Sequence, residues 1–199
     1  MKVVVLCEGA TEEALKNGLR EFVQSRASAT RRIGVATRSL DGPVMRKKLA
    51  RIADLLLAHG DVAGVIALSD VYPDFKTAQE TKTSLRTCAG EAGKNPLFRA
   101  HAAQFEVEAW IIPSWAEIAA RLRLDASPPG SDPERINSQK PPSHHLKELY
   151  ARAHQRYEKP VDGPKWLTAD RLERAPGLCP ELSMFLNSML EFAGGQPLA

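Results

Sequence analysis

Continuous apolar runs alternate with amphipathic segments along the first half of the chain. The run Lys2–Cys7 predicts a strand covered on both faces, because a half-exposed strand would alternate polar and apolar residues. Ile33–Thr37 predicts a short second strand, and Val62–Leu68 another apolar strand. Apolar residues at helical spacing from Thr11 to Val23 and from Pro43 to Leu56 predict helices that each pack one face on a sheet. Thr11 is the expected cap of the first helix. This order predicts a mostly parallel sheet of four or five strands with helices on both faces.

The second half of the chain is predicted to be mainly helical. A fourth strand is expected within Arg99–Ile112, and it ends in the sequence Phe-Glu-Val-Glu-Ala-Trp. Residues 76–89 predict an exposed helix before this strand, and Ser114–Leu124 a helix after it. Shorter helices are expected at residues 143–157, 164–172 and 180–192. The predicted fold class is therefore α/β with a C-terminal helical extension.

The same pattern divides a single domain into three segments. Residues 1–124 are expected to form the α/β core. Residues 125–142 contain five prolines together with Ser, Gly, Asn and Asp, which is typical of a long loop. This loop is either a lid over a site or a spacer. Residues 143–193 are expected to form a helical extension that packs on the core.

Composition narrows the class of protein without identifying its function. Apolar residues make up 43% of the chain and charged residues 26%, which suits a packed core and argues against disorder. Three widely spaced cysteines without a CxxC pair argue against a disulfide framework or a zinc site. No apolar run approaches the ~20 residues of a membrane span. A soluble, cytoplasmic protein is expected.

Acidic residues gather at the expected carboxyl edge of the sheet, where open parallel sheets bind ligands. Glu8 ends the first strand, Asp70 follows the third, and Glu106 and Glu108 belong to the end of the fourth, while Glu12 lies one helical turn after Glu8. Carboxylates this close repel one another, so they either take up protons or bind a cation. Oxygen ligands without His or Cys suit Mg²⁺ or Mn²⁺. Such ions usually act on phosphate esters, by polarising a phosphoryl oxygen and activating a water.

Structural roles for the same acids stay open. Glu12 stands in a first helical turn, where a carboxylate stabilises any helix by ~0.3–1 kcal/mol. Asp70 could cap a turn. Glu106 and Glu108 share one face of the expected strand, so one could be a ligand and the other the partner of a buried Lys or Arg. Glu8 is the hardest to explain structurally, because it directly ends an apolar strand.

Motifs for other chemistries are missing, since the sequence has no P-loop, dinucleotide fingerprint, nucleophile elbow or HExxH. Two basic stretches read either as solvated faces or as cations that hold nucleic-acid phosphates. Lys159 and Lys165 flank a turn-forming Pro-Val-Asp-Gly-Pro segment that could direct a lysine to the acidic edge, and they are the expected nucleic-acid contacts. The first stretch comprises Arg31, Arg32, Arg38, Arg46, Lys47, Lys48 and Arg51, and the second Arg152, Arg156, Lys159, Lys165, Arg171 and Arg174.

The sequence Val-Leu-Cys-Glu-Gly-Ala-Thr-Glu at residues 5–12, followed by Asp70 after an apolar strand, resembles the TOPRIM superfamily. Its glutamate–glycine turn followed by Thr-Glu looks most like the OLD-type nucleases. Further motifs are similar to a narrower family of small bacterial TOPRIM-like proteins, a domain of unknown function. These motifs are Phe105–Trp110, Ile136-Asn137 with Pro142-Ser143, Lys159 with Gly163, and Cys179-Pro180.

The resemblance implies a Rossmann-like, TOPRIM-like fold and a divalent metal, Mg²⁺ or Mn²⁺, held by Glu8 and Asp70. Glu12, Glu106 and Glu108 would be further ligands or a base for the attacking water. It also implies a nuclease or other phosphoryl-transfer protein acting on nucleic acid, in bacterial defence against phage or plasmids with an AAA- or ABC-type ATPase partner.

This sequence departs from the TOPRIM pattern in one respect. Its Asp-x-Asp pair on the third strand is incomplete, because Tyr72 replaces the second aspartate. That change puts two-metal catalysis in question. The alternative is a non-catalytic TOPRIM-like module that binds an ATPase partner or nucleic acid.

Overall fold

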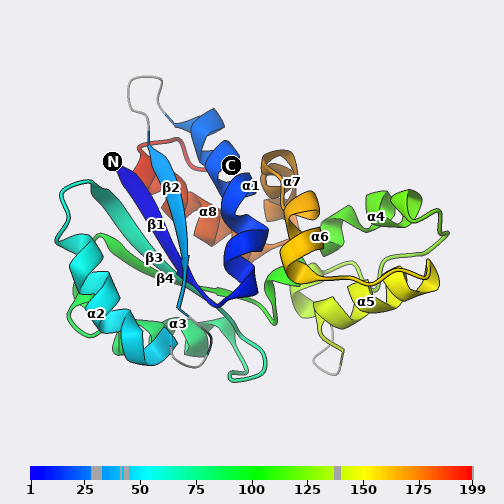
Figure 1. Cartoon of the computed structure of the whole chain (residues 1–199), viewed down its shortest axis with the longest axis horizontal. Helices are drawn as coiled ribbons and strands as arrows, with labels where there is room; N and C mark the ends of the chain where they lie inside the picture. Colours follow the sequence, from blue (N-terminus) through cyan, green and yellow to red (C-terminus); the bar gives the residue numbers. More distant parts are fainter. Residues whose placement is uncertain (28–32, 41, 43–44, 137–139, 199) are drawn as a thin grey trace.

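The structure is a computed structural model that describes residues 1–27, 33–40, 42, 45–136 and 140–198, with the backbone alone for residues 10, 12 and 13. Within these ranges the strands form one parallel four-stranded sheet in the order β2-β1-β3-β4 (Figure 1). The predicted parallel sheet is confirmed. The strands are β1 (Lys2–Cys7), β2 (Gly34–Ser39), β3 (Val62–Asp70) and β4 (Phe98–Ala103).

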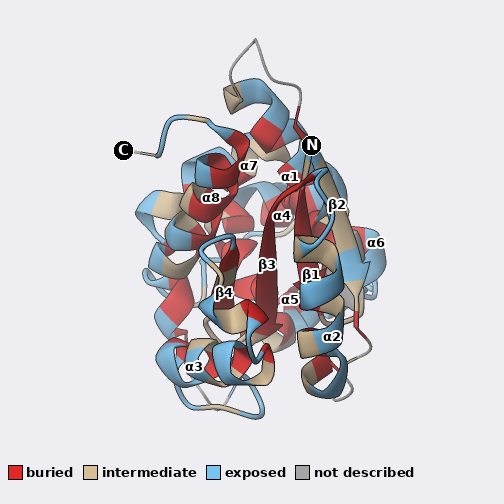
Figure 2. Ribbon diagram, turned by 90° about the vertical axis from the view of Figure 1, so that its left-hand side faces the viewer, coloured by how far each residue is buried: buried red, intermediate tan, exposed pale blue. Residues whose placement is uncertain are grey.

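Helices cover both faces of the sheet. Helices α2 (Met45–Leu57) and α3 (Ala78–Cys88) share a core with the side chains of Val4, Leu6, Val65 and Ala67 on one face. Helices α1 (Ala10–Arg26) and α8 (Pro180–Ala193) share a second core with alternate residues of the same strands. Strand β3 is buried along nearly its whole length between these layers (Figure 2). The predicted helices on both faces are therefore confirmed.

The remaining helices lie to the right of the sheet or beside α1 in Figure 1. They are α4 (Trp115–Arg121), α5 (Pro142–Arg152), α6 (Lys159–Trp166) and α7 (Ala169–Arg174). Short 3-10 helices connect the larger elements: η2 (Ala92–Lys94), η3 (Val107–Trp110), η4 (Ile112–Ser114), η5 (Pro133–Arg135) and η6 (Ala175–Gly177).

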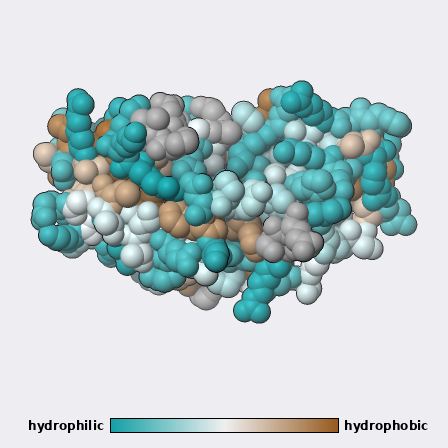
Figure 3. All heavy atoms as spheres, turned by 90° about the horizontal axis from the view of Figure 1, so that it is seen from below, coloured by the Kyte–Doolittle hydropathy of each residue, from teal (hydrophilic) through white to brown (hydrophobic). Residues whose placement is uncertain are grey.

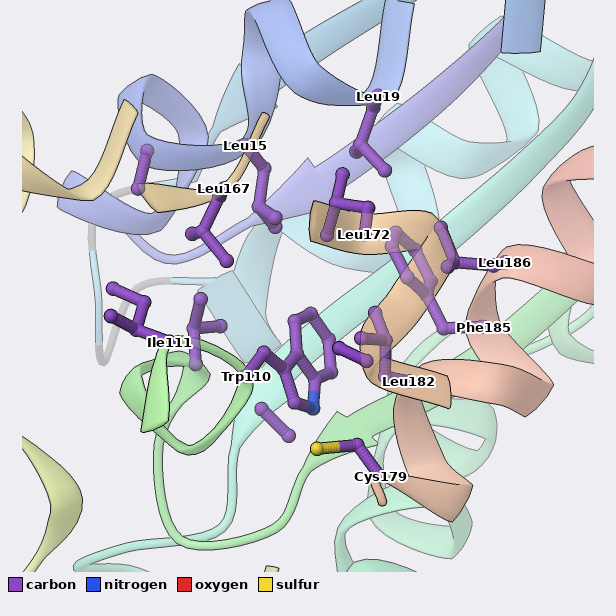
Figure 4. Packing of buried hydrophobic residues seen from close by; sticks show 14 of the residues in the cluster. Leu15, Leu19, Trp110, Ile111, Leu167, Leu172, Cys179, Leu182, Phe185 and Leu186 are labelled. Carbon is purple, nitrogen blue, oxygen red and sulfur yellow. The ribbon is translucent and has the colours of Figure 1, made fainter. Parts of the chain in front are cut away.

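The C-terminal helices complete the core of the sheet. Trp110, which follows β4, lies among side chains of α1, α7 and α8 (Figure 4). Its ring stacks on Phe185 of α8 with the two centroids 5.6 Å apart. Leu15 of α1 belongs to the same buried cluster as both rings. Residues from 1–124 and from 143–193 therefore share one hydrophobic core.

The proline-rich segment is fixed to that core by Glu134, which is buried. One carboxylate oxygen of Glu134 accepts a hydrogen bond from Trp110 Nε1 at 3.0 Å, and the other accepts one from the backbone N–H of Glu181 at 2.9 Å. The second bond satisfies a free N–H group in the first turn of α8. This part of the loop is thus tied to the start of the last helix.

Two local predictions are wrong. Strand β4 ends at Ala103, and Glu106 and Glu108 do not share one face of a strand, because Val107–Trp110 forms η3. Phe105 has a left-handed backbone with φ of 64°, which breaks the strand. Helix α1 begins at Ala10 with Gly9 as its N-cap, so Thr11 is inside the helix rather than its cap.

Other differences from the sequence-based prediction are smaller. The expected turn after Lys159 is the first turn of α6. Pro43, Arg31, Arg32 and Asn137 lie outside the described residues.

The surface seen from below in Figure 3 is mostly hydrophilic, with a narrow band of hydrophobic atoms across part of it. Within the described ranges, no helix combines the length and the apolar character needed to cross a bilayer.

Candidate acidic site at the carboxyl edge of the sheet

Glu8 and Asp70 leave the sheet on neighbouring parallel strands. Cys7 is in register with Leu68, so both acids stand at the same edge. The chain turns after Glu8 through Gly9, whose φ of 49° favours glycine over residues with a side chain. The N–H of Gly9 donates to Ser39 Oγ at 2.9 Å, which attaches this turn to the end of β2.

A lysine lies between two acids of this edge. Lys159 Nζ is 2.8 Å from Glu108 Oε2 and 3.3 Å from Asp70 Oδ2. The three side chains are 19%, 2% and 15% exposed, respectively, so water screens their charges only weakly. The second Asp70 oxygen, Oδ1, accepts the N–H of Val107 at 3.0 Å. This bond joins the end of β3 to the turn that presents Glu108.

Close packing of α6 on α1 brings Lys159 to the sheet edge. A Cβ placed on Gly163 would lie only 2.7 Å from Ala14 Cβ of α1, so glycine permits this approach. Lys159 is the first residue of α6, four residues before Gly163. The resemblance linked Lys159 with Gly163, and the structure gives the pair a physical connection through this helix contact.

Burial in the site disfavours the charged form of its acids and raises their pKa values. Burial, and then the charge of Asp70, raise the pKa of Glu8, although a hydrogen bond from Ser69 opposes the shift. Burial raises the pKa of Asp70 against the effect of Lys159. Burial likewise raises the pKa of Glu108 to about 7. The cluster therefore disfavours a full set of negative charges.

Lys159 nevertheless stays charged. Burial lowers the pKa of its ammonium, but the charges of Asp70 and Glu108 outweigh burial and raise that pKa above its ordinary value. A single ammonium thus offsets parts of several carboxylates. The positive charge of Arg46 of α2 lowers the pKa of Glu8. Arg46 is itself paired with Asp74 at 2.5 Å.

Glu106 is engaged in a structural contact. Its Oε2 accepts the backbone N–H of Ser143 at 3.0 Å, in the first turn of α5. A carboxylate at this position satisfies a free N–H group and interacts favourably with the helix dipole. Glu106 therefore anchors α5 beside the acidic edge.

The structure brings together five of the residues singled out from the sequence: Glu8, Asp70, Glu106, Glu108 and Lys159. Glu12 lies in the first turn of α1, but its side chain is outside what the structure describes. Lys165, the other expected nucleic-acid contact, pairs with Asp162 at 2.8 Å rather than with an acid of the edge.

Other residues of the second basic stretch are used within the fold. Arg171 and Arg174 both pair with Glu117 of α4.

Sequence reasoning missed Tyr157, whose buried hydroxyl finds no hydrogen-bond partner among the described residues. Burial, and then the charge of Glu108, raise the pKa of that hydroxyl. No local sequence pattern around Tyr157 indicated this position.

No group of three or more His, Cys, Asp and Glu side chains in the described ranges is arranged to hold a metal ion. At this edge, Glu8 lies close enough to Asp70 for the charge of Asp70 to raise its pKa. Glu108 forms an ion pair with Lys159.

Comparison with known proteins gives one family. A model of a domain of unknown function, DUF4276, matches residues 7–190 of the chain. Comparison with curated proteins gives no match. Among solved structures, the chain is similar to the C-terminal region of the OLD protein of Xanthomonas campestris pv. campestris, with 13% identity over 96% of this chain and 93% of that chain. The TM-score is 0.42, which is too low to support an argument.

Proposed function

The chain belongs to the DUF4276 family, and on that premise we propose that it is a divalent-cation-dependent phosphoryl-transfer protein, in particular a nuclease, acting on nucleic acid. One observation supports this above the others. Glu8 and Asp70 stand at the carboxyl ends of adjacent parallel strands, and the pKa of each is raised by burial, with Asp70 adding to the shift of Glu8. A cation between two such acids would relieve their repulsion.

The donor set fits one Mg²⁺ or Mn²⁺ better than a closed cage of protein ligands. Mg²⁺ commonly keeps several waters and is bound by one or two carboxylates together with substrate phosphates. Glu8 and Asp70 supply two carboxylates at adjacent strand ends. When bound, the ion would polarise a phosphoryl oxygen and activate a water. We assign it to Glu8 and Asp70, with Glu106 and Glu108 outside its ligands.

The protein's own residues supply the remaining requirements. Lys159 holds a permanent positive charge next to Asp70, where it can donate to a phosphate oxygen. Glu108, with a pKa of about 7, can accept a proton near neutral pH. Because Lys159 covers Glu108, a substrate phosphate must first draw the ammonium away from it.

A second candidate, a non-catalytic module, is favoured by the same lysine. Lys159 already neutralises part of the charge on Asp70 and Glu108, so these acids need no metal to be tolerated in the fold. Such a module would bind nucleic acid or an ATPase partner. The ATPase partner and a role in bacterial defence are proposals that rest on the family resemblance alone.

The variant Glu8→Gln distinguishes the two functions. We expect the wild-type protein to bind Mg²⁺ or Mn²⁺ in calorimetry and to cleave plasmid DNA or labelled oligonucleotides. Glu8→Gln should stay folded but lose both properties, by more than the roughly 10–100-fold that loss of an outer-shell metal partner costs. The matched control is Glu91→Gln, since Glu91 is 83% exposed and remote from the site in the fold. If the wild-type protein binds no metal and cleaves nothing, the non-catalytic module replaces the nuclease.

A further inference from the structure

A basic groove runs along the outer side of α2, next to the edge strand β2. It is a pocket of about 440 Å³ lined by cationic and aliphatic side chains. Among the described residues, none of the side chains lining it is acidic. The lining comprises Arg38, Lys48, Arg51 and His59 with Ile52, Leu55 and Leu56.

The sequence of α2 explains how the groove forms. Residues 48, 51, 52, 55 and 56 recur at intervals of three and four, so they occupy one face of the helix, and His59 follows its C-terminal end. Ile52 and Leu56 belong to the apolar stripe that packs α2 on the sheet, yet both are only partly buried, and Leu55 is 55% exposed. From Lys48 to Leu56 this face extends roughly 12 Å.

Two of the arginines are available to a ligand. Arg38 and Arg51 are exposed, and in the described part of the chain neither forms an ion pair with an acid. An arginine without a carboxylate partner offers a planar set of donors that matches phosphate oxygens. The charge of the groove therefore complements an anionic chain.

Residues that neighbour the groove along the chain also lie near the acidic site. Arg38 is followed by Ser39, whose hydroxyl accepts the N–H of Gly9, the residue next to Glu8. Helix α2 also begins beside that edge, because Arg46 in its first turn acts on Glu8 and pairs with Asp74. The elements β2 and α2 thus contribute residues both to the groove and to the surroundings of Glu8.

We propose that the groove between β2 and α2 binds the phosphates of a nucleic-acid strand whose reacting bond lies at the Glu8–Asp70 edge. This proposal rests on the proposed function for the class of its ligand. Arg38 and Arg51 contact phosphates. The aliphatic part of the lining carries no sequence information, so binding is independent of base sequence.

The test measures binding without cleavage. Fluorescence anisotropy of labelled single-stranded and duplex oligonucleotides is recorded in EDTA at several salt concentrations. The double variant Arg38→Gln/Arg51→Gln is compared with Arg20→Gln/Lys147→Gln, which removes the same charge from exposed positions of α1 and α5. Thermal unfolding checks that both variants fold.

We expect the groove variant to bind at least tenfold more weakly. The slope of log K against log salt should fall by about 1.4–1.8, as loss of two phosphate contacts predicts. The control variant should change binding less than threefold. Equal weakening by both variants, or none by either, would overturn the proposal. Binding of a polyglutamate peptide as tight as that of nucleic acid would overturn it too, since the groove would then be a general anion surface.

The outcomes separate this proposal from the nuclease function. If the groove variant binds as the wild type does while Glu8→Gln abolishes cleavage, the nuclease stands and the groove proposal fails. If the groove variant loses binding while the wild-type protein cleaves nothing with Mg²⁺ or Mn²⁺, the groove stands and the nuclease fails.

Discussion

Lys159 determines the charge of the acidic edge. A buried ammonium with two carboxylates is costly to assemble, and removal of one partner from such a group typically costs about 3–5 kcal/mol. The contacts of Lys159 with Asp70 and Glu108 therefore differ from an ordinary ion pair on the surface, because all three side chains are mostly buried. The sequence suggested that Lys159 or Lys165 could reach the acidic edge. It could not identify which lysine or which acids would meet, because the contacts of Lys159 with Asp70 and Glu108 span 89 and 51 positions of the chain. What the sequence did indicate was a surplus of acid at this edge.

At the residue scale, His101 makes stability depend on pH. Its Nε2 lies 2.9 Å from Ser188 Oγ, and its Nδ1 finds no partner in the described part of the chain. Burial, aided by nearby cations, lowers the pKa of His101 to about 3. The folded protein thus keeps this ring neutral while the unfolded chain protonates it below pH 6.5. The stability that His101 contributes is complete above pH 6.5 and is lost as the pH falls towards 3.

We therefore expect His101→Gln to flatten the acid side of the stability profile. Between pH 7.5 and pH 5, the wild-type protein should lose about 2 kcal/mol more unfolding free energy than the variant, measured by urea denaturation. The raised pKa values of Glu8, Asp70 and Glu108 act in the opposite direction, but both proteins share them. Ser188→Ala, which leaves His101 buried, should keep the wild-type slope. Parallel profiles for wild type and His101→Gln would contradict this account.

At the scale of elements, apolar periodicity predicted the strands and most helices, because burial between two layers leaves a continuous pattern. It failed after β4. The alternation of Glu106 and Glu108 with apolar residues reads as a strand, but the left-handed Phe105 and the bond from Val107 to Asp70 impose a turn. The role of Glu134 was equally hidden, since its partners Trp110 and Glu181 lie far away in the sequence.

Gly18 of α1 lies against Leu167, just before α7, and this contact predicts that an alanine at Gly18 destabilises the protein. Alanine in place of a helical glycine usually stabilises a protein by up to about 1 kcal/mol. A Cβ on Gly18, however, would lie 1.7 Å from the backbone oxygen of Leu167, which cannot move aside as a flexible side chain could. Figure 4 shows Leu167 and Leu172 packed beside Leu15 and Leu19 of α1.

Gly18→Ala should accordingly destabilise the protein by about 1–3 kcal/mol in urea denaturation, the usual cost of overpacking. The matched control is Asn17→Ala, an exposed neighbour on the same helix, which should change stability by a few tenths of a kcal/mol at most. A stabilising effect of Gly18→Ala would show that α1 and the Leu167 segment do not pack this closely.

At the scale of the whole molecule, the sheet and the C-terminal helices form one cooperative unit. Helix α8 packs so closely on β3 that a Cβ on Gly64 would lie 2.3 Å from the ring of Phe192. Lys82 of α3 and Glu181 of α8 add a mostly buried ion pair at 2.8 Å. Sequence patterns could mark residues 1–124 as an α/β segment. They also predicted that the helical extension packs on this core, but they could not show that α8 shares one face of the sheet with α1.

A chain that ends at residue 124 should therefore fail to fold. It would lose five fully buried side chains of α8, each stabilising the fold by about 1.5–3 kcal/mol, against a total stability of about 5–15 kcal/mol for a typical domain. These are Leu182, Phe185, Leu186, Met189 and Leu190. Circular dichroism should show no cooperative thermal transition. A control chain ending at Gly195 loses, among the described residues, only exposed or half-buried ones and one hydrogen bond from Leu198, so it should unfold cooperatively. Cooperative unfolding of the 124-residue chain would instead establish two independent units, because its sheet would then be stable with one face covered by α1 alone.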